Sequence, residues 1–156
     1  MGVWKALAAT GVSGGSYIYA DSKAEALVWF EGTRLDLVTT KGTTLGIAEV
    51  SIDGGPGQRI DLYSPSTLRQ QVVWSSGTLT DGTHSVAVRW TGERSAPAGG
   101  TRVAIDRLNV TGRLVQTPLL TTYQETSSLL SYSGSWTRLV TGSASGGSLR
   151  YASVAG

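Results

Sequence analysis

Two residues stand in contexts that could indicate catalysis or metal binding, Ser13 and His84. Ser13 lies in "GVSGG", which fits the G-x-S-x-G nucleophile elbow of α/β-hydrolases. That elbow requires a following helix and partners in the order Ser, Asp, His, whereas the strand-like "SYIYAD" follows here. We therefore predict that the glycines around Ser13 form a turn and that Ser13 is not a nucleophile.

His84 is the single histidine of the chain. It alternates with Val86 and Val88 in "HSVAVRW", so it shares the apolar face of a predicted strand. We expect a neutral side chain that donates to a backbone carbonyl. A single histidine without a nearby cysteine or carboxylate cluster does not form an ordinary zinc site. With no triad and no catalytic carboxylate pair, we expect that the protein is not an enzyme.

Asp106 is predicted to carry a carboxylate on an apolar face. In "RVAIDRLNV" it alternates with Ala104 and Leu108. A buried carboxylate without compensation is costly. We therefore expect Asp106 either to pair with an arginine, Arg102 or Arg107, or to bind a cation.

The aromatic residues indicate a binding surface. The chain has five Trp and six Tyr but one Phe. Trp and Tyr rings carry a polar group, so they are preferred where one side of the ring stays in contact with water. Such rings stack on the C–H groups of sugars, and polar side chains bond the sugar hydroxyls. The tryptophans within predicted strands, Trp29, Trp74 and Trp90, are expected in the core. The candidates for ligand binding in predicted loops are Trp4, Lys41, Tyr63, Arg94 and Trp136.

Short strands with glycine-rich turns must position these residues. Glycine accounts for 21 of 156 residues and charged residues for 15%, which is typical of neither a helical bundle nor a disordered chain. The predicted strands are Glu25 to Phe30, Arg34 to Thr39, Gly46 to Asp53, Arg59 to Ser64, Arg69 to Ser75, His84 to Trp90 and Arg102 to Val110. They predict an all-β, two-sheet sandwich of jelly-roll type.

Charge and hydropathy exclude several partners. The net charge is +2 with scattered positive residues, so we expect no nucleic-acid partner. The absence of cysteine excludes disulfides and thiolate metal sites. No apolar stretch approaches the roughly 20 residues of a membrane span, so no membrane insertion is expected.

Two phrases near the ends of the chain are nearly identical, "SGGSYIYA" from Ser13 and "SGGSLRYA" from Ser145. A shift of 132 positions aligns them and also pairs Trp4 with Trp136 and Tyr19 with Tyr151. Over the 21 positions from Trp4 to Ala24, eight residues are identical. We interpret this match as an internal repeat of which the second copy is represented only by its opening.

The motifs "SGGSYIYA", "IAEVSIDG", "IDLYS", "LTDGTHSVAVRWTG" and "TRVAIDRLNV" together resemble the galactose-binding-domain-like β-sandwiches. The closest resemblance is to repeat modules of bacterial secreted enzymes related to family 6 and family 35 carbohydrate-binding modules. It implies a jelly-roll sandwich in permuted order, with the opening strand "YQETSSLLSYSGSW" placed at the C-terminus. It also implies a structural calcium ion, for which Asp106 and Glu125 are the matching residues, and an extracellular or cell-surface location in bacteria as part of a larger protein.

The predicted organisation is a body at residues 1–112, a linker at 113–122 and the opening strands of the next repeat at 123–156. The predicted function is non-catalytic, weak binding of polysaccharide. The alternative is a structural or adhesive repeat that self-associates head-to-tail by strand exchange and has no small-molecule ligand. Because the segment 123–156 supplies strands that the body lacks, it is expected to pair either with its own body or with a second molecule.

Overall fold

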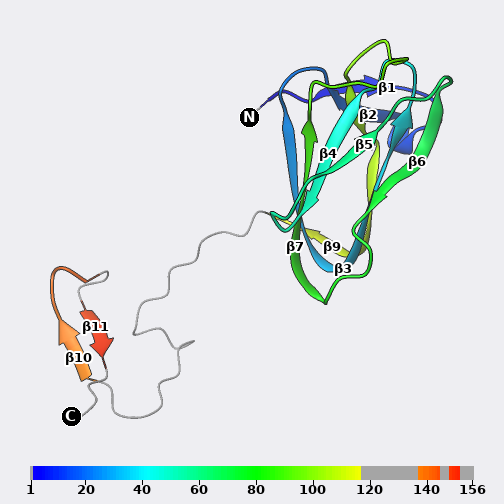
Figure 1. Cartoon of the computed structure of the whole chain (residues 1–156). Helices are drawn as coiled ribbons and strands as arrows, with labels where there is room; N and C mark the ends of the chain where they lie inside the picture. The colour runs from blue at the N-terminus through cyan, green and yellow to red at the C-terminus, as the bar shows by residue number, and fades with distance from the viewer. Residues whose placement is uncertain (1, 117–136, 145–147, 152–156) are drawn as a thin grey trace. The chain divides into compact units, whose positions relative to one another are not determined.

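The computed structural model describes residues 2–116, 137–144 and 148–151, and the chain divides into two compact units, Met1–Pro118 and Leu119–Gly156 (Figure 1). The described residues are strands and turns, with a single short 3-10 turn at Ser13–Gly15. The predicted all-β class is therefore confirmed. The strands of the larger unit are β1 (Lys5–Ala8), β2 (Ser16–Ala20), β3 (Glu25–Lys41), β4 (Ile47–Ile52), β5 (Gln58–Asp61), β6 (Leu68–Ser75), β7 (Gly82–Trp90), β8 (Val103–Ile105) and β9 (Arg107–Val115).

The long strand β3 organises the larger sheet, whose order is β5-β4-β7-β3-β6 with β9 also paired to β3. The first half of β3 pairs with β7, the second half with β6, and the middle with β9, all antiparallel. The sequence predicts two separate strands here, Glu25 to Phe30 and Arg34 to Thr39. The structure joins them, and the interruption in the pattern corresponds to a register shift between Gly32 and Arg34.

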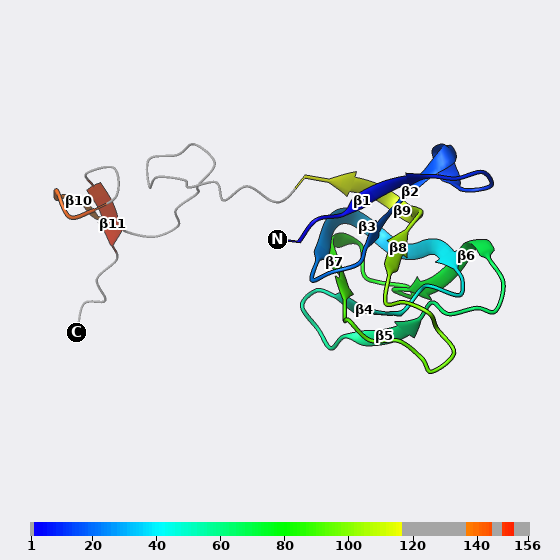
Figure 2. The same ribbon diagram turned by 90° about the horizontal axis from the view of Figure 1, so that it is seen from above.

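A second, three-stranded sheet of order β1-β2-β8 forms another layer of the larger unit. Figure 2 shows β1 and β2 on the side of this unit opposite to β4 and β5. The predicted strand Arg102 to Val110 is divided at Asp106 into β8 and β9, which pair with β2 and β3 respectively. This division lets one stretch of chain belong to both layers of the sandwich. Beyond it, β9 continues through Val115, into the range 113–122 that the sequence predicts as a linker.

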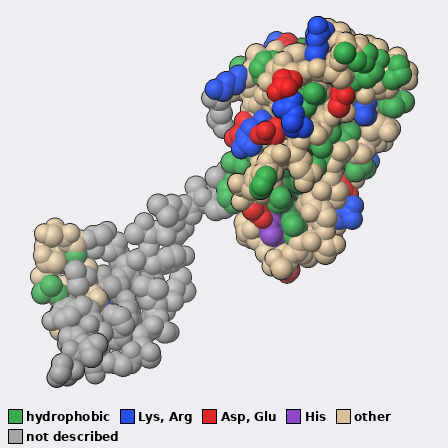
Figure 3. Space-filling model, in the orientation of Figure 1, with side chains coloured by type: hydrophobic (Ala, Val, Ile, Leu, Met, Phe, Trp, Pro, Cys, Tyr) green, Lys and Arg blue, Asp and Glu red, His purple; other side chains and the backbone are tan. Residues whose placement is uncertain are grey.

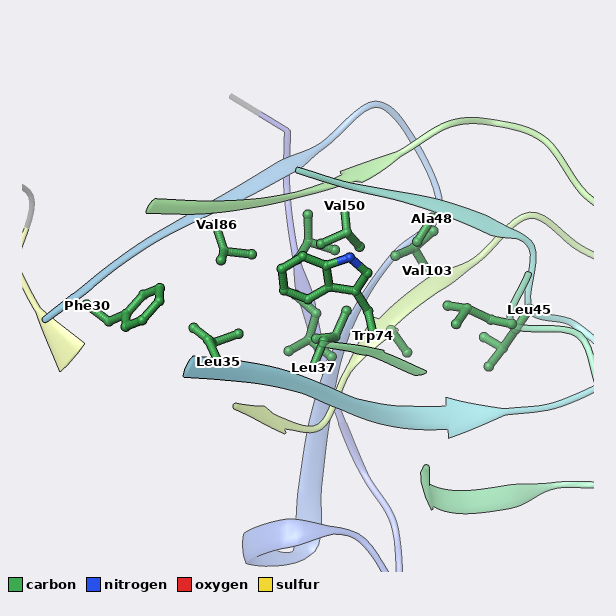
Figure 4. Packing of buried hydrophobic residues seen from close by; sticks show 13 residues of the cluster. Phe30, Leu35, Leu37, Leu45, Ala48, Val50, Trp74, Val86 and Val103 are labelled. Atoms are coloured by element: carbon green, nitrogen blue, oxygen red, sulfur yellow. The ribbon is translucent and has the colours of Figure 1, made fainter. Parts of the chain in front are cut away.

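The core lies between the layers and contains aliphatic side chains around Trp74 (Figure 4). Trp74 is 5% exposed, and its indole N–H donates to the Gln58 side chain at 3.1 Å, so its polar atom is satisfied. In β7, His84, Val86 and Val88 are buried, as the alternation predicts. None of the described residues belongs to a helix with the length and hydropathy that a bilayer crossing requires.

Two glycines allow β3 and β9 to approach at the register shift. Gly32 and Gly112 are direct partners, with φ of 149° and 136°. A Cβ on either residue would lie 2.0 Å from a backbone carbonyl oxygen, that of Thr111 or Glu31 respectively. Because that oxygen belongs to the backbone, the contact cannot be relieved by a side-chain rotation. The pairing of β3 with β9 therefore requires glycine at both positions.

The smaller unit contains a hairpin of β10 (Thr137–Val140) and β11 (Ser148–Tyr151). Its register pairs Thr137 with Tyr151 and Val140 with Ser148. In the larger unit, β1 and β2 pair Lys5 with Tyr19 and Ala8 with Ser16. Each of these positions differs from its counterpart by 132, so the two hairpins have the same register as well as related sequences. The predicted strand region 123–136 lies outside the described residues.

We expect Gly112→Ala to lower the free energy of unfolding by about 2 kcal/mol or more, since it adds a backbone clash to an unfavourable φ. Gly77→Ala is the matched control, because Gly77 also has a positive φ, 70°, but has no atom within 4 Å of an added Cβ. Urea denaturation of both variants measures the difference. Equal losses for the two would show that the approach of β3 and β9 imposes no steric requirement.

Candidate functional site

A polar hollow of about 410 Å3 lies where three parts of the larger unit meet. The β1–β2 hairpin forms one wall, the connection that follows β3 forms a second, and the start of β6 forms a third. Its lining residues are Leu7, Ala8, Ala9, Thr10, Tyr17, Thr40, Lys41, Gly42, Thr43, Thr44, Leu45, Thr67 and Arg69. The hollow therefore presents threonine side chains, one aromatic ring and two cationic side chains to a ligand.

Backbone hydrogen bonds fix the wall that follows β3. The Gly42 amide donates to the Leu62 carbonyl at 3.1 Å, and the Gly42 carbonyl accepts from the amides of Ser64 and Leu45, each at 3.3 Å. Gly42 also forms a parallel bridge with Tyr63. Lys41 and the threonines beside it are thus held on an anchored segment, so a ligand would not have to order this wall on binding.

The charge of this hollow is positive and uncompensated. Its lining contains Lys41 and Arg69 but no carboxylate, and among the described residues neither cation has an ion-pair partner. Thr40 is 5% exposed, and its hydroxyl has no hydrogen-bond partner in the described structure. A buried hydroxyl without a partner is unusual and costly.

A larger hollow of about 580 Å3, lined by Gly2, Lys23, Ala24, Glu25, Arg89 and Trp90, is electrostatically different. Its Arg89 forms an ion pair with Glu25 and a second one with Glu49 at 3.3 Å, and it also donates to the Ser51 hydroxyl. Figure 3 shows acidic and basic side chains intermixed on one face of the larger unit. Because two of its three charged side chains, Arg89 and Glu25, are paired with each other and only Lys23 has no ion pair within the described residues, this hollow is a weaker candidate for binding an anionic ligand than the one around Lys41.

The structure separates the ligand-binding residues that the sequence predicts. Lys41 lines the polar hollow, and Tyr63 lies on the chain segment that pairs beside it. Trp4 packs against the core, and its indole N–H is buried without a partner. Arg94 donates to the Ala98 carbonyl and so closes its own loop. Trp136 lies outside the described residues.

Sequence reasoning missed Arg69, Thr40 and Tyr17 as members of this site. The threonines around Lys41 in "TTKGTT" were a usable signal, but nothing in the sequence brings β6 or the β1–β2 hairpin to that segment. Within residues 2–116, every aromatic side chain is either buried or only partly exposed. The surface of residues 2–116 therefore has no group of several fully exposed rings, and Tyr17 is the single ring in the polar hollow.

Ser13 is part of a turn, as predicted. Gly14 and Gly15 have φ of 61° and 77°, and β2 follows the turn where a hydrolase would have a helix. The Ser13 amide donates to Asp106 Oδ1 at 2.8 Å, and its hydroxyl accepts from Arg107 at 3.3 Å. These bonds attach the turn to the point at which β8 becomes β9.

The compensation of Asp106 differs from the arginine pairing that the sequence suggests. Within the described part of the chain, neither Arg102 nor Arg107 forms an ion pair with Asp106. Arg102 lies instead over the ring of Tyr19, 5.0 Å from its centroid. Asp106 accepts the Ser13 amide on one oxygen, while its Oδ2 is buried without a partner.

The free Oδ2 of Asp106 fits one ligand position of a calcium ion, which needs about six to eight oxygens. Glu125, the other predicted ligand, lies outside the described residues. Within the described ranges, no group of three or more His, Cys, Asp or Glu side chains is placed to hold a metal ion. A calcium ion at Asp106 therefore stays a prediction, supported here by one unpartnered carboxylate oxygen.

His84 has a carboxylate partner that the sequence did not indicate. Its Nε2 lies 2.9 Å from the Thr80 carbonyl, the kind of bond predicted, but its Nδ1 lies 2.7 Å from Asp53 Oδ2. Both partners are acceptors, so both ring nitrogens are satisfied as donors only in the charged form. The Thr80 carbonyl and then the Asp53 carboxylate raise the pKa of His84 above its ordinary value of about 6.5. The expectation of a neutral histidine is thus not supported by these partners.

Comparison with known proteins shows the fold. No protein-family model matches the chain, and no curated protein sequence matches it. Among solved structures, a xanthan lyase of Paenibacillus matches with 18% identity and a TM-score of 0.54, over 96% of this chain and 15% of the lyase. A family two carbohydrate esterase from Clostridium thermocellum, in complex with cellohexaose, matches with 21% identity and a TM-score of 0.43, over 66% of this chain and 30% of the esterase. The chain thus spans a small part of the proteins that it resembles.

We expect Asp106→Ala to lower the free energy of unfolding by about 1.5–3 kcal/mol, because it removes a charged acceptor from the Ser13 amide. Urea denaturation measures this loss, and an unchanged stability would show that the bond contributes nothing. If calcium binds at Asp106, a chelator lowers the melting temperature of the native protein but not that of Asp106→Ala. If the chelator affects neither protein, the calcium prediction is wrong.

The contribution of His84 to stability is expected to depend on pH. Because the folded state raises the pKa of His84, it holds the proton more tightly than the unfolded state does. The stabilisation is therefore complete below about pH 6.5 and is lost as the pH rises through the raised pKa. Urea denaturation at a series of pH values on both sides of 6.5 measures the free energy of unfolding. Asp53→Asn should show a smaller pH dependence, because it removes the carboxylate but leaves the Thr80 carbonyl in place. An identical pH dependence in Asp53→Asn would contradict this assignment.

Proposed function

We propose that the larger unit is a non-catalytic carbohydrate-binding module of a bacterial secreted or cell-surface protein, and that it binds polysaccharide weakly in the polar hollow around Lys41. The observation that carries the proposal is the presence of two cationic side chains in the lining of one hollow, Lys41 and Arg69, neither of which has an ion-pair partner among the described residues. Convergent polar groups on an anchored wall are typical of a small-molecule site. Open solvent at the mouth allows one or a few residues of a longer polymer to enter.

The charge of the hollow favours a saccharide that carries a carboxylate. Lys41 and Arg69 supply charge-assisted donors, and the lining contains no acidic side chain that would repel an anionic sugar. The threonine hydroxyls donate to and accept from sugar hydroxyls. Tyr17 provides one apolar face for the C–H groups of the ring. With a single aromatic ring, the site relies on polar groups, which gives the low affinity that we propose.

The similarity of fold supports a module within a larger protein. The matching structure is described as a xanthan lyase, of which this chain corresponds to 15%. A module of this size that accompanies an enzyme acting on xanthan is compatible with a role in holding the polymer. The described side chains also support a non-catalytic role. Both nitrogens of His84 are engaged by Asp53 and Thr80, and the partners of Ser13 are Asp106 and Arg107.

The test is retention of the full chain by carboxylated polysaccharides in affinity electrophoresis, each compared with its methyl-esterified form, for example polygalacturonate and its methyl ester. We expect retention by the carboxylated form and weaker retention by the ester. Lys41→Glu and Arg69→Glu should each lower the affinity about tenfold or more, since each replaces a charge-assisted donor by a repelling carboxylate. Gly42→Leu should block binding sterically, because a Cβ at Gly42 has only the Thr67 hydroxyl within 4 Å.

Lys23→Glu is the matched control. It makes the same change in net charge, but Lys23 lines the larger hollow. Equal losses for Lys23→Glu and Lys41→Glu would show that binding depends on net charge and not on this site. If no carboxylated or neutral polysaccharide retains the protein, carbohydrate binding is refuted. The structural repeat that self-associates, which is the alternative expected from the sequence, would then be favoured by the duplicated hairpin.

A further inference from the structure

A β-bulge in β6 adjoins the polar hollow. In the pairing of β3 with β6, Thr39 lies opposite Gln71 and Lys41 lies opposite Leu68. One residue of β3 separates these two pairs, whereas two residues of β6 do, so β6 has one extra residue at this point. A bulge of this kind changes the direction of the side chains on the strand that contains it.

One of the two residues in the bulge, Gln70, has an unusual backbone. Its φ is 53°, and within the described residues Asp53 is the one other residue besides glycine with a positive φ. This left-handed region is unfavourable for a residue that has a Cβ. Such a conformation persists only where the surrounding structure enforces it, and it is found most often at functional sites.

Side-chain hydrogen bonds connect Gln70 to two other elements. Its Nε2 donates to the Gly11 carbonyl at 3.3 Å, in the loop between β1 and β2. Its Oε1 accepts from Arg107 Nη1 at 3.5 Å, at the first residue of β9, and the same Nη1 donates to the Ser13 hydroxyl at 3.3 Å. The bulge is therefore held against both the hairpin loop and β9.

The extra residue determines where Arg69 lies. Counted from the pair at Thr39, a β6 strand without the bulge would place Arg69 directly opposite Lys41. Like charges in that position repel each other. With the bulge, Leu68 lies opposite Lys41 instead, and Arg69 lines the hollow without being paired to the other cation.

The Arg69 side chain also lies against the hairpin loop. A Cβ added to Gly11 would lie 3.1 Å from Arg69 Cδ and 3.7 Å from Arg69 Nε. The residue that accepts the hydrogen bond from Gln70 is thus the one along which Arg69 passes. The conformation of Gln70 and the direction of Arg69 are coupled through this contact.

We propose that Gln70 is a positioning residue of the polar hollow, whose left-handed backbone holds Arg69 apart from Lys41 and directs it toward the carboxylate of the ligand. The inference rests on the proposed function, since it is that function which assigns the carboxylate to Arg69. Gln70 does not line the hollow, so it acts through Arg69. The essential property at position 70 is then the backbone conformation and not the side-chain amide.

Three substitutions separate these two properties. Gln70→Gly and Gln70→Asn remove or shorten the side chain but tolerate a positive φ, whereas Gln70→Val opposes it, because a β-branched residue rarely adopts this conformation. In affinity electrophoresis with polygalacturonate, we expect the Gly and Asn variants to stay within about threefold of the native affinity and Gln70→Val to lose about tenfold or more. Equal losses in all three, or no loss in Gln70→Val, would overturn the proposal.

Two further variants test whether the effect passes through Arg69. In an Arg69→Ala background, Gln70→Val should cause little additional loss of affinity, and a full additional loss would contradict the positioning role. Gly77→Val is the matched control, because it places the same β-branched residue at a positive φ of 70° outside the lining of the hollow. It should keep the native affinity, and a loss equal to that of Gln70→Val would show a general effect of strain.

A measurement without ligand distinguishes this inference from the proposed function. If polygalacturonate does not retain the native chain, the proposed function fails, but the 15N relaxation of the Arg69 Nε–Hε group still reports whether its side chain is held. We expect restricted motion in the native, Gln70→Gly and Gln70→Asn proteins and increased motion in Gln70→Val. Equal motion in the native protein and Gln70→Val would overturn the positioning role. Gln70→Ala replaces the Val variant if that variant does not fold, since alanine also disfavours a positive φ.

Discussion

Because β3 pairs with β7 and β6 along one edge and with β9 along the other, it connects most of the strands of the larger unit. That arrangement is possible only if β3 and β9 approach at Gly32 and Gly112, where no side chain fits. β9 in turn follows β8 after the division at Asp106, and β8 holds the β1–β2 hairpin. The strands that enclose the core around Trp74 are thus positioned by the close approach of β3 and β9 at these two glycines.

The polar hollow is a consequence of the same arrangement. β3 ends at Lys41, so Thr40 and Lys41 lie in the lining of the hollow. Arg69 lies there as well, because β6 pairs with the second half of β3. The opposite wall belongs to the β1–β2 hairpin, which contributes Tyr17, the one aromatic ring in the lining of the hollow.

The sequence was most informative where a pattern is local. Alternation placed His84, Val86 and Val88 on one face, and the glycines identified the turn at Ser13, because both depend on neighbouring residues. The single strand β3 was missed, since a bulge at Gly32 interrupts the alternation without ending the strand. Residues that meet only in three dimensions were not predictable: Asp53 contacts His84 because β4 pairs with β7, and Arg69 lies near Lys41 because β6 pairs with β3. Trp4 was expected in a binding loop, but its neighbours in space make it part of the core boundary.

The central claim is that the hollow at the end of β3 binds a carboxylated saccharide, and backbone amide chemical shifts test it most directly. The measurement is a titration of the isotope-labelled full chain with an oligosaccharide that carries carboxylates. The account predicts shifts at Thr40 to Leu45 and at Arg69, with smaller shifts at Thr10 and Tyr17, which line the opposite wall. Shifts centred on Lys23, Arg89 and Trp90, or saturating ligand without any localised shift, would contradict it.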